Sequence, residues 1–298
     1  MKQASGPSRR RVSARESRNP PASAAEHRRV LRLASRLAEE LDPRGRSAVL
    51  LAGSWARGDA HEASDVDLWV VGRKGHHRIL ERDGLMVCVK YSLAANERRE
   101  LRTPARLDGA VPGWRNAKIL RDPRGIAAKL KGEARRFRWP PVRRARDQFI
   151  ADALAGWAEE VAKLLRALAT GERETASVQR NLLADHMAFL WLLASEQLWE
   201  TENGMWEDAA RRSGPAFAAA QRAALGTDGS GWRASCEGAL RLYALTAQAN
   251  LGLLHGDRRR VVLAVCRRAG YPIDDPRSKG RRPASGPSGP SSRSGVPS

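Results

Sequence analysis

The sequence predicts an α+β protein in which a small mixed β-sheet domain is followed by a helical bundle domain, with disordered basic termini. Short apolar runs closed by glycine lie between residues 48 and 92, as expected for strands. After residue 139 most segments show the three- to four-residue apolar period of helices. Both ends are rich in Ser, Pro, Gly and Arg, and neither carries enough apolar surface to fold. The expected boundaries are 1–25 for a basic tail, 26–138 for the sheet domain, 139–273 for the helical domain and 274–298 for a second tail.

Composition narrows the class of protein. The chain has 298 residues, of which 42% are hydrophobic, an ordinary value for a globular protein with a real core. No apolar run approaches the length of about 18 residues that a membrane-spanning helix needs, and the N-terminus has no apolar signal segment. Cys88, Cys236 and Cys266 are an odd number at unrelated spacings, which fits a reducing compartment better than a disulfide framework. We therefore expect a cytoplasmic protein.

The formal charge of +20 raises the question of nucleic acid. Much of this charge lies in the two tails, and charge alone argues only for non-specific affinity for phosphate. The excess of arginine over lysine and the abundance of alanine are also typical of a GC-rich coding sequence. Nucleic-acid binding is therefore possible but disfavoured.

The expected elements of the sheet domain follow one another closely. Residues 26–41 repeat apolar side chains every three to four positions, which predicts an amphipathic helix that ends before Pro43. "SAVLLAG" and "SDVDLWVVG" are typical of buried strands. In "HRILERDGLMVCVKYS" two strand segments meet at Asp83-Gly84, a dipeptide typical of a tight hairpin. After Ser92 the pattern is irregular until "WRNAKILRDPRG", and "GIAAKLKGEARRF" then predicts a helix.

The remaining segments predict a bundle. Helices are expected in "RDQFIADALAGWAEEVAKLLRALATG", "GWRASCEGALRLYALTAQAN" and "RRRVVLAVCRRAG". "SVQRNLLADHMAFLWLLASEQLW" is apolar on nearly all sides, as in a buried helix, so we expect Asp185 and His186 within it to form a buried hydrogen-bonded pair. The following tryptophans are expected to be mostly core, with one or two lining a groove: Trp139, Trp157, Trp191, Trp199 and Trp206.

Two acids interrupt the second predicted strand. Alternate residues of a strand share a face, so Asp65 and Asp67 lie together and repel each other. A bound divalent cation resolves this repulsion, and magnesium is commonly held by one or two carboxylates and by substrate phosphates. The preceding strand ends in Gly53-Ser54, where a close backbone approach and a hydroxyl are suited to phosphate. Gly58 relaxes the next turn, and Arg57 is a further candidate to pair with phosphate, although a solvated arginine is an equally good interpretation.

An apolar strand, Gly-Ser, a short gap and Asp-x-Asp on the next strand together resemble the signature of the DNA polymerase beta-like nucleotidyltransferase superfamily. Residues 113–130, "GWRNAKILRDPRGIAAKL", also resemble the DPxG stretch that follows the catalytic sheet in many bacterial members. The helical second domain suggests the branch similar to kanamycin nucleotidyltransferase.

The resemblance implies transfer of an NMP from an NTP to a hydroxyl of a small-molecule (aminoglycoside-like) or protein acceptor. It also implies two Mg²⁺ ions, with Asp65 and Asp67 as catalytic metal ligands, and Gly53, Ser54, Arg57 and Gly58 on the nucleotide phosphates. A homodimer that completes the site is possible.

One expected residue is missing. The second metal of the family needs a third carboxylate on a later strand, and the matching position holds Cys88, whose thiol is a poor ligand for a hard cation. Lys90 on the same face is a candidate to neutralise the aspartates. Three interpretations stay open: another acid takes the role, the protein is a slow one-metal enzyme, or it is a catalytically impaired protein that binds nucleotide or nucleic acid. We favour a transferase, and the candidate acids are Glu62, Glu81, Glu159, Glu160 and Asp185.

Overall fold

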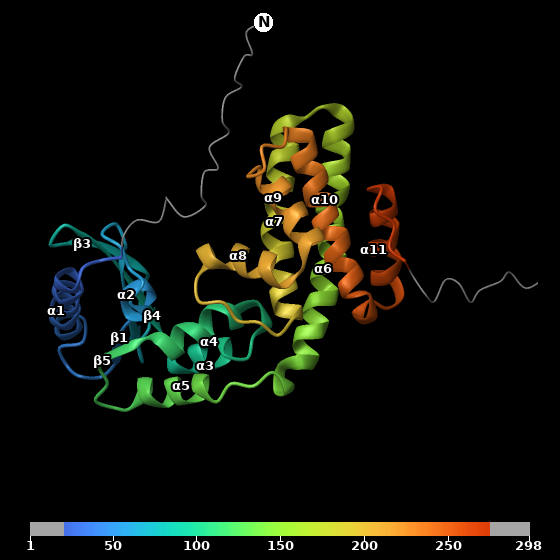
Figure 1. Ribbon diagram of the computed structural model, residues 1–298. Coiled ribbons are helices and arrows are strands. Elements are labelled where there is room, and N and C mark those ends of the chain that lie inside the picture. Colours follow the sequence, from blue (N-terminus) through green and yellow to red (C-terminus); the bar gives the residue numbers. More distant parts are fainter. Residues whose placement is uncertain (1–20, 275–298) are drawn as a thin grey trace, which may run out of the picture. The chain divides into compact units, whose positions relative to one another are not determined.

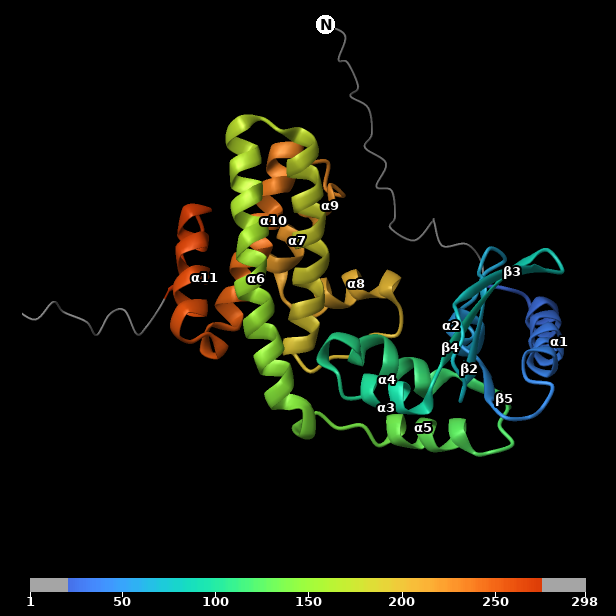
Figure 2. The same ribbon diagram turned by 180° about the vertical axis from the view of Figure 1, so that it is seen from behind.

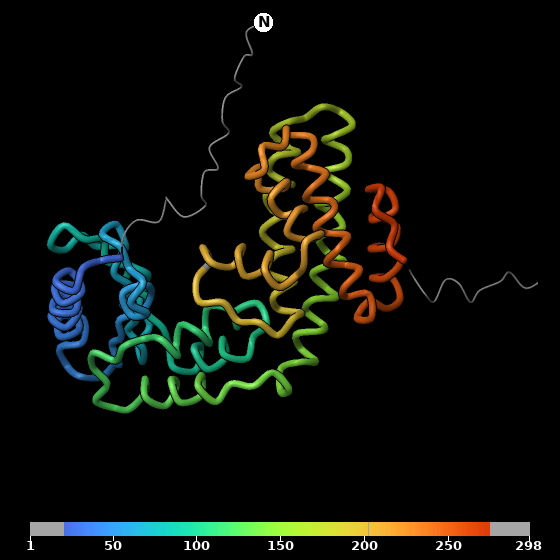
Figure 3. Tube along the Cα trace, viewed as in Figure 1, coloured from blue at the N-terminus to red at the C-terminus, as the bar shows by residue number. Residues whose placement is uncertain are grey.

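The computed structural model describes residues 21–274, and the chain forms two compact units (Figure 1). The first unit contains the described chain as far as Arg146, together with the returning segment Ser195–Trp206. The second contains Asp147–Ala194 and the chain from Glu207 onwards. Figure 3 lets the reader follow this double passage along the trace. Apart from residues 21–25 and Asp274, the predicted tails lie outside the described residues.

The sheet of the first unit is mixed, as predicted. Its strand order is β3-β4-β2-β1-β5. β2 and β4 are parallel, whereas β1 pairs antiparallel with both β2 and β5, and β3 pairs antiparallel with β4. The strands are β1 (Ala48–Leu51), β2 (Val66–Val71), β3 (Arg78–Arg82), β4 (Leu85–Ser92) and β5 (Lys118–Arg121).

The predicted hairpin joins β3 to β4. Asp83 and Gly84 both have positive φ, 55° and 76°, the left-handed pair that a two-residue turn requires. The Glu81 carboxylate accepts the Gly84 N–H at 2.7 Å and closes the turn. The Asp83-Gly84 dipeptide was therefore sufficient to predict this hairpin.

Helix α1 (Ala24–Leu41) covers one face of the sheet (Figures 1 and 2). It begins two residues before the predicted start because Ser23 and Glu26 form a capping box. Its apolar stripe packs on alternate strand residues, so the face of the sheet under α1 is a buried apolar layer. The buried strand residues of this layer are Val49, Leu51, Val66, Leu68, Val70, Val87 and Val89.

The opposite face is only partly covered. Trp69 of β2 packs against buried Trp114 of α4, with ring centroids 5.5 Å apart. Trp114 in turn donates through Nε1 to the buried Glu97 carboxylate at 2.9 Å. Asp67, two residues before Trp69, lies on this same face beyond that packing. The start of β2 thus remains available for a site.

Short elements surround the sheet, and two of them correct the sequence prediction. The stretch after Ser92 was expected to be irregular, yet it contains α3 and α4. The sequence does not reveal their helical period for two reasons. The charged residue Glu97 occupies a buried position of α3, where the Trp114 indole donates to its carboxylate, and Pro112 lies inside α4. The elements are α2 (Gly53–Arg57), α3 (Ala94–Glu100), α4 (Leu107–Asn116), α5 (Ile126–Arg135) and the 3-10 turns Pro104–Arg106 and Pro140–Val142.

The second unit is a helical bundle in which α6, α7, α9 and α10 lie side by side (Figures 1 and 2). The Tyr243 hydroxyl of α10 donates to the Leu154 carbonyl of α6 at 2.7 Å. α6 and α8 each span the border between the two units. The helices are α6 (Arg143–Thr170), α7 (Arg173–Ala194), α8 (Glu202–Arg212), α9 (Pro215–Leu225), α10 (Trp232–Ala249) and α11 (Gly256–Arg268), with a 3-10 turn at Leu251–Leu253.

The prediction for α7 was wrong in two respects. The helix ends at Ala194 and does not continue to Trp199, because the following residues return to the first unit. Asp185 is exposed and His186 is half-buried, so they are not a buried pair. His186 instead contacts the Trp157 ring at 3.8 Å between centroids, and its Nδ1 lies 3.0 Å from the Leu182 carbonyl.

The tryptophans are also less buried than expected. Of the five that the sequence placed mostly in the core, only Trp199 is buried. The other four are partly exposed: Trp139, Trp157, Trp191 and Trp206. Within the described residues, none of the helices is both long and apolar enough to cross a membrane.

Close packing of α9 on α10 yields a testable prediction. A Cβ at buried Gly238 would lie 2.7 Å from the Ala224 nitrogen, so Gly238→Ala should destabilise the protein by about 1–3 kcal/mol. Exposed Gly156 in α6 has open space around it, and Gly156→Ala should stabilise the protein by about 0.5–1 kcal/mol through helix propensity. Urea unfolding of both variants measures the difference, and equal effects would contradict the close packing.

Candidate functional site

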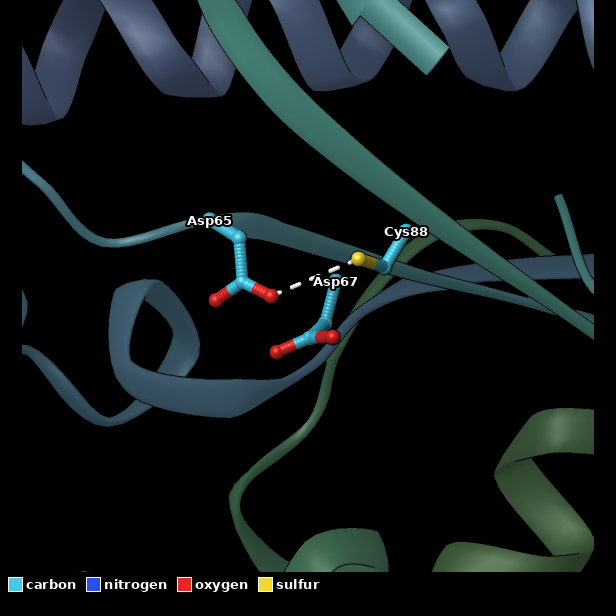
Figure 4. A group of neighbouring side chains, drawn as sticks. All are labelled: Asp65, Asp67 and Cys88. Atoms are coloured by element: carbon cyan, nitrogen blue, oxygen red, sulfur yellow. Dashed lines mark hydrogen bonds between the residues drawn. The ribbon is translucent and has the colours of Figure 1, made fainter. Parts of the chain in front are cut away.

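The two predicted aspartates lie together at the start of β2. Asp65 directly precedes the strand and Asp67 is its second residue. On the neighbouring parallel strand, Cys88 is paired in register with Asp67. One ligand atom of each side chain lies within 4.8 Å of the others, and within the described part of the chain no other group of three His, Cys, Asp or Glu side chains is this close. Figure 4 shows the two carboxylates and the thiol on the same side of the strands.

Gly53 makes room for one of these carboxylates. Its φ is +64°, and a Cβ at this position would lie 2.0 Å from Oδ2 of Asp67. The Ala52 N–H donates to the Asp67 carbonyl at 2.9 Å, which joins the end of β1 to the start of β2. The sequence predicted a close approach at Gly53. In the structure the group that approaches is the Asp67 carboxylate.

The Gly-Ser turn opens the short helix α2. Ser54 lies in its first turn and accepts the Gly58 N–H through its carbonyl at 2.8 Å. Gly58 ends the helix with φ of 92°, as expected for a glycine that relaxes a turn. Buried Trp55 donates through Nε1 to the Ser64 carbonyl at 3.3 Å, so the helix is fixed to the residue before Asp65. Helix α2 is therefore fixed to the segment that leads into β2.

Arg57 has two partners. Its Nε donates to Asp59 at 3.1 Å, and a terminal nitrogen donates to the Glu200 carbonyl at 3.3 Å. The side chain is only 16% exposed. Arg57 thus links the returning segment Ser195–Trp206 to α2. The solvated arginine that the sequence left open is not observed.

A cavity of about 720 Å³ lies beside these residues, entirely within the first unit. Beyond the predicted residues, its walls include Asp108 and Gly109 from the start of α4 and Trp199 from the returning segment. Neither contribution carries a spacing signal in the sequence, because both reach the site through tertiary folding. The lining residues are Gly53, Ser54, Arg57, Asp59, His61, Ala63, Ser64, Asp65, Asp67, Asp108, Gly109, Trp199, Glu200, Thr201 and Asn203.

The electrostatics favour a bound cation. Burial, and secondarily the charge of Asp65, raise the pKa of Asp67 to about 6, although Arg57 and His77 oppose this shift. Two carboxylates that resist joint ionisation are the usual setting for a divalent ion. By geometry and donor type, Asp65 and Asp67 fit one Mg²⁺ ion.

Cys88 does not fit a hard cation. Its thiol donates to Oδ2 of Asp65 at 3.3 Å (Figure 4). Burial, this hydrogen bond and the nearby carboxylates raise the pKa of Cys88 to about 11, so the ion-free side chain is a neutral thiol. Sulfur prefers softer metals than magnesium. The donor set therefore supports one magnesium ion and disagrees with a second one at the thiol.

Lys90 does not neutralise the aspartates. Its Nζ lies 2.9 Å from the Glu97 carboxylate and 3.4 Å from that of Glu100. The same amine lies 5.2 Å from the Trp69 ring centroid. Because Lys90 is bound to these partners, it does not pair with Asp65 or Asp67.

The candidate replacements for the third acid lie outside this cluster. Glu62 and Glu81 are exposed, and Glu81 closes the hairpin turn. The other candidates belong to the second unit, where Glu159 and Glu160 share Lys163 and Asp185 faces solvent. Within the described residues, the third position of the cluster is filled by Cys88.

Removal of the charge at Asp67 should stabilise the ion-free protein. Burial raises the pKa of this carboxyl from 3.8 to about 6, so the fold accepts its neutral form better than its charged form. The contribution of Asp67 to stability is therefore fully present below pH 3.8 and is lost as the pH rises through about 6. Because the group is partly solvated, we expect Asp67→Asn to gain only about 1 kcal/mol at neutral pH. The gain should vanish near pH 4. Chemical denaturation at the two pH values measures it, and a pH-independent effect would contradict this assignment.

Gly53 and Gly58 offer a matched pair of substitutions. Both have positive φ, so alanine at either position should cost about 1–2 kcal/mol of stability. Only at Gly53 does the new Cβ displace Asp67, since nothing lies within 4 Å of a Cβ at Gly58. We expect Mn²⁺ binding, followed by electron paramagnetic resonance, to be lost in Gly53→Ala and retained in Gly58→Ala. Equal binding by the two variants would show that the displacement is harmless.

Comparison with known proteins places this geometry in a family. Residues 32–109 match the family model described as "Nucleotidyltransferase domain". Among solved structures, the chain is similar to a nucleotidyltransferase-like protein from Exiguobacterium sibiricum 255-15, at 17% identity over 79% of each chain with a TM-score of 0.48. No curated protein matches the sequence. The branch similar to kanamycin nucleotidyltransferase stays a prediction. The matched segment, which contains Gly53, Ser54, Asp65, Asp67 and Cys88, is a nucleotidyltransferase domain of the DNA polymerase beta-like superfamily.

Proposed function

We propose that this protein transfers an NMP from an NTP to a hydroxyl of a small-molecule or protein acceptor, with the help of a divalent metal ion. The observation that carries the proposal is the convergence of Asp65 and Asp67 on the wall of a cavity of about 720 Å³. This volume lies in the range of ordinary ligand sites. The nucleotidyltransferase domain supplies the reaction class.

Each residue has a definite task in this proposal. Asp65 and Asp67 hold the metal ion, which would screen the triphosphate charge and make the acceptor hydroxyl more acidic. Gly53 leaves room for the Asp67 carboxylate, and Ser54 offers its hydroxyl to a phosphate from the cavity wall. Arg57 contributes positive charge at the same wall and braces Glu200. The roles of Ser54, Arg57 and Gly58 toward phosphate are proposals.

The charge of the cavity favours one type of acceptor. Among the described residues that line it are five carboxylates and one arginine. Asp65 and Asp67 are assigned to metal, and Asp59 is paired with Arg57. Glu200 adds negative charge on a remaining wall. Such a lining attracts cations, so we favour a small acceptor that carries both hydroxyl and amino groups, as aminoglycosides do.

A second function has an observation of its own. Cys88 occupies the position of the third carboxylate, so the site could bind nucleotide without transferring it. Under this alternative the protein is a catalytically impaired nucleotidyltransferase that retains a nucleotide-binding pocket. Product formation separates the two functions.

Asp65→Asn tests the proposed transfer. Purified protein is incubated with α-labelled ATP, Mg²⁺ and an amine-bearing polyhydroxy acceptor, and both labelled acceptor and pyrophosphate are measured. Loss of a metal ligand should reduce the rate about a hundredfold or more. The control is Asp83→Asn on the exposed hairpin turn, which should keep wild-type activity because asparagine tolerates the positive φ there.

Unchanged turnover in Asp65→Asn would end the proposed mechanism. If wild-type protein binds ATP with Mg²⁺ but forms no product with any acceptor, the impaired nucleotide-binding alternative takes its place. A preference for anionic or protein acceptors over amine-bearing ones would contradict the acceptor class while leaving the transfer itself intact.

A further inference from the structure

We propose that Asp65, Asp67 and Cys88 together form a mixed carboxylate–thiolate site for a borderline divalent cation of the zinc class, in place of the second magnesium ion. This inference rests on the proposed function only in that the cation serves the same centre. It follows from the disagreement between the three-carboxylate pattern of the superfamily and the donor atoms found here.

The distances suit such an ion. In a tetrahedral site, Zn–S and Zn–O bonds of about 2.3 and 2.0 Å place sulfur and oxygen about 3.5 Å apart. Sγ of Cys88 lies 3.3 Å from Oδ2 of Asp65. The third donor, from Asp67, lies within 4.8 Å of both. Only small side-chain movements are therefore needed to close three ligands around one ion.

The donor chemistry points the same way. Thiolate ligands select zinc-class ions over magnesium, whereas carboxylates accept either. Three protein ligands with a remaining open position are also typical of catalytic zinc sites and not of structural ones. On binding, the sulfur–metal bond replaces the S–H bond, and the thiol proton passes to solvent.

The sheet holds the thiol where this site requires it. Cys88 is in register with Asp67 on the adjacent parallel strand, and its neighbours Val87 and Val89 are fully buried on the opposite face. The nearby amine of Lys90 is bound to Glu97 and Glu100. Cys88 forms no disulfide, so its sulfur is available as a ligand.

Cobalt titration tests the site directly. Co²⁺ bound by a thiolate gives a near-ultraviolet charge-transfer band that does not depend on enzymatic activity. We expect wild-type protein to develop this band at one equivalent of Co²⁺ and to keep it in excess Mg²⁺. Cys88→Ser should abolish the band and weaken Co²⁺ binding more than about tenfold.

The other cysteines provide matched controls. Cys236 and Cys266 are fully buried in the second unit, so Cys236→Ser and Cys266→Ser should both retain the band. Cys88→Asp restores a third carboxylate. It should lose the band and bind Mg²⁺ more than about tenfold more tightly than the wild type does, as expected for an oxygen donor. Circular dichroism and melting curves of each variant confirm that it is folded.

Two results would overturn the proposal: absence of the band in the wild-type protein, or its persistence in Cys88→Ser. Failure of the proposed function is separately visible. A protein that shows the band but neither binds nor uses ATP has the metal site without the transferase, whereas ATP-dependent transfer without the band leaves the transferase with magnesium alone.

Discussion

Repulsion between two carboxylates is the constraint on which the first unit depends. Asp65 and Asp67 share one face at the start of β2, and the missing Cβ of Gly53 leaves room for the Asp67 carboxylate. The opposite face of the same strand is sealed by α1, so the two acids cannot relax into the core. Strand, turn and cavity thus gather negative charge at one point, which a bound cation or protonation of Asp67 relieves. The raised pKa of Asp67 reflects the cost of this arrangement to the ion-free protein.

Sequence reasoning succeeded wherever the signal was local. The strands of the sheet follow from short apolar runs, the Asp83-Gly84 hairpin from turn chemistry, and the shared face of Asp65 and Asp67 from the two-residue period of strands. The match of residues 32–109 to a nucleotidyltransferase domain agrees with the resemblance carried by Gly53, Ser54 and the two acids.

Sequence reasoning failed wherever the deciding contact joins residues that are far apart in the sequence. α3 was missed because the burial of Glu97 makes sense only once the Trp114 indole is in place. Asp185 was expected to be buried because α7 is rich in apolar residues, but one side of that helix faces solvent, as exposed Val178 also shows. Trp199 was among the tryptophans considered for a groove, yet no pattern distinguished it from the others. The domain limits at 138 and 273 stay a prediction, since the compact first unit includes a segment that returns after α7.

The returning segment has an evolutionary consequence. Arg57 and the Glu200 carbonyl that it binds are 143 positions apart, so one wall of the cavity is encoded well beyond the metal ligands. A recombination event that exchanged the chain after residue 194 would place a new wall beside Asp65 and Asp67. The corner formed by α2 and the start of β2 would be inherited unchanged while the facing wall of the cavity was replaced. Under the proposed function, such an arrangement would allow a lineage to change its acceptor while keeping the carboxylates of the site.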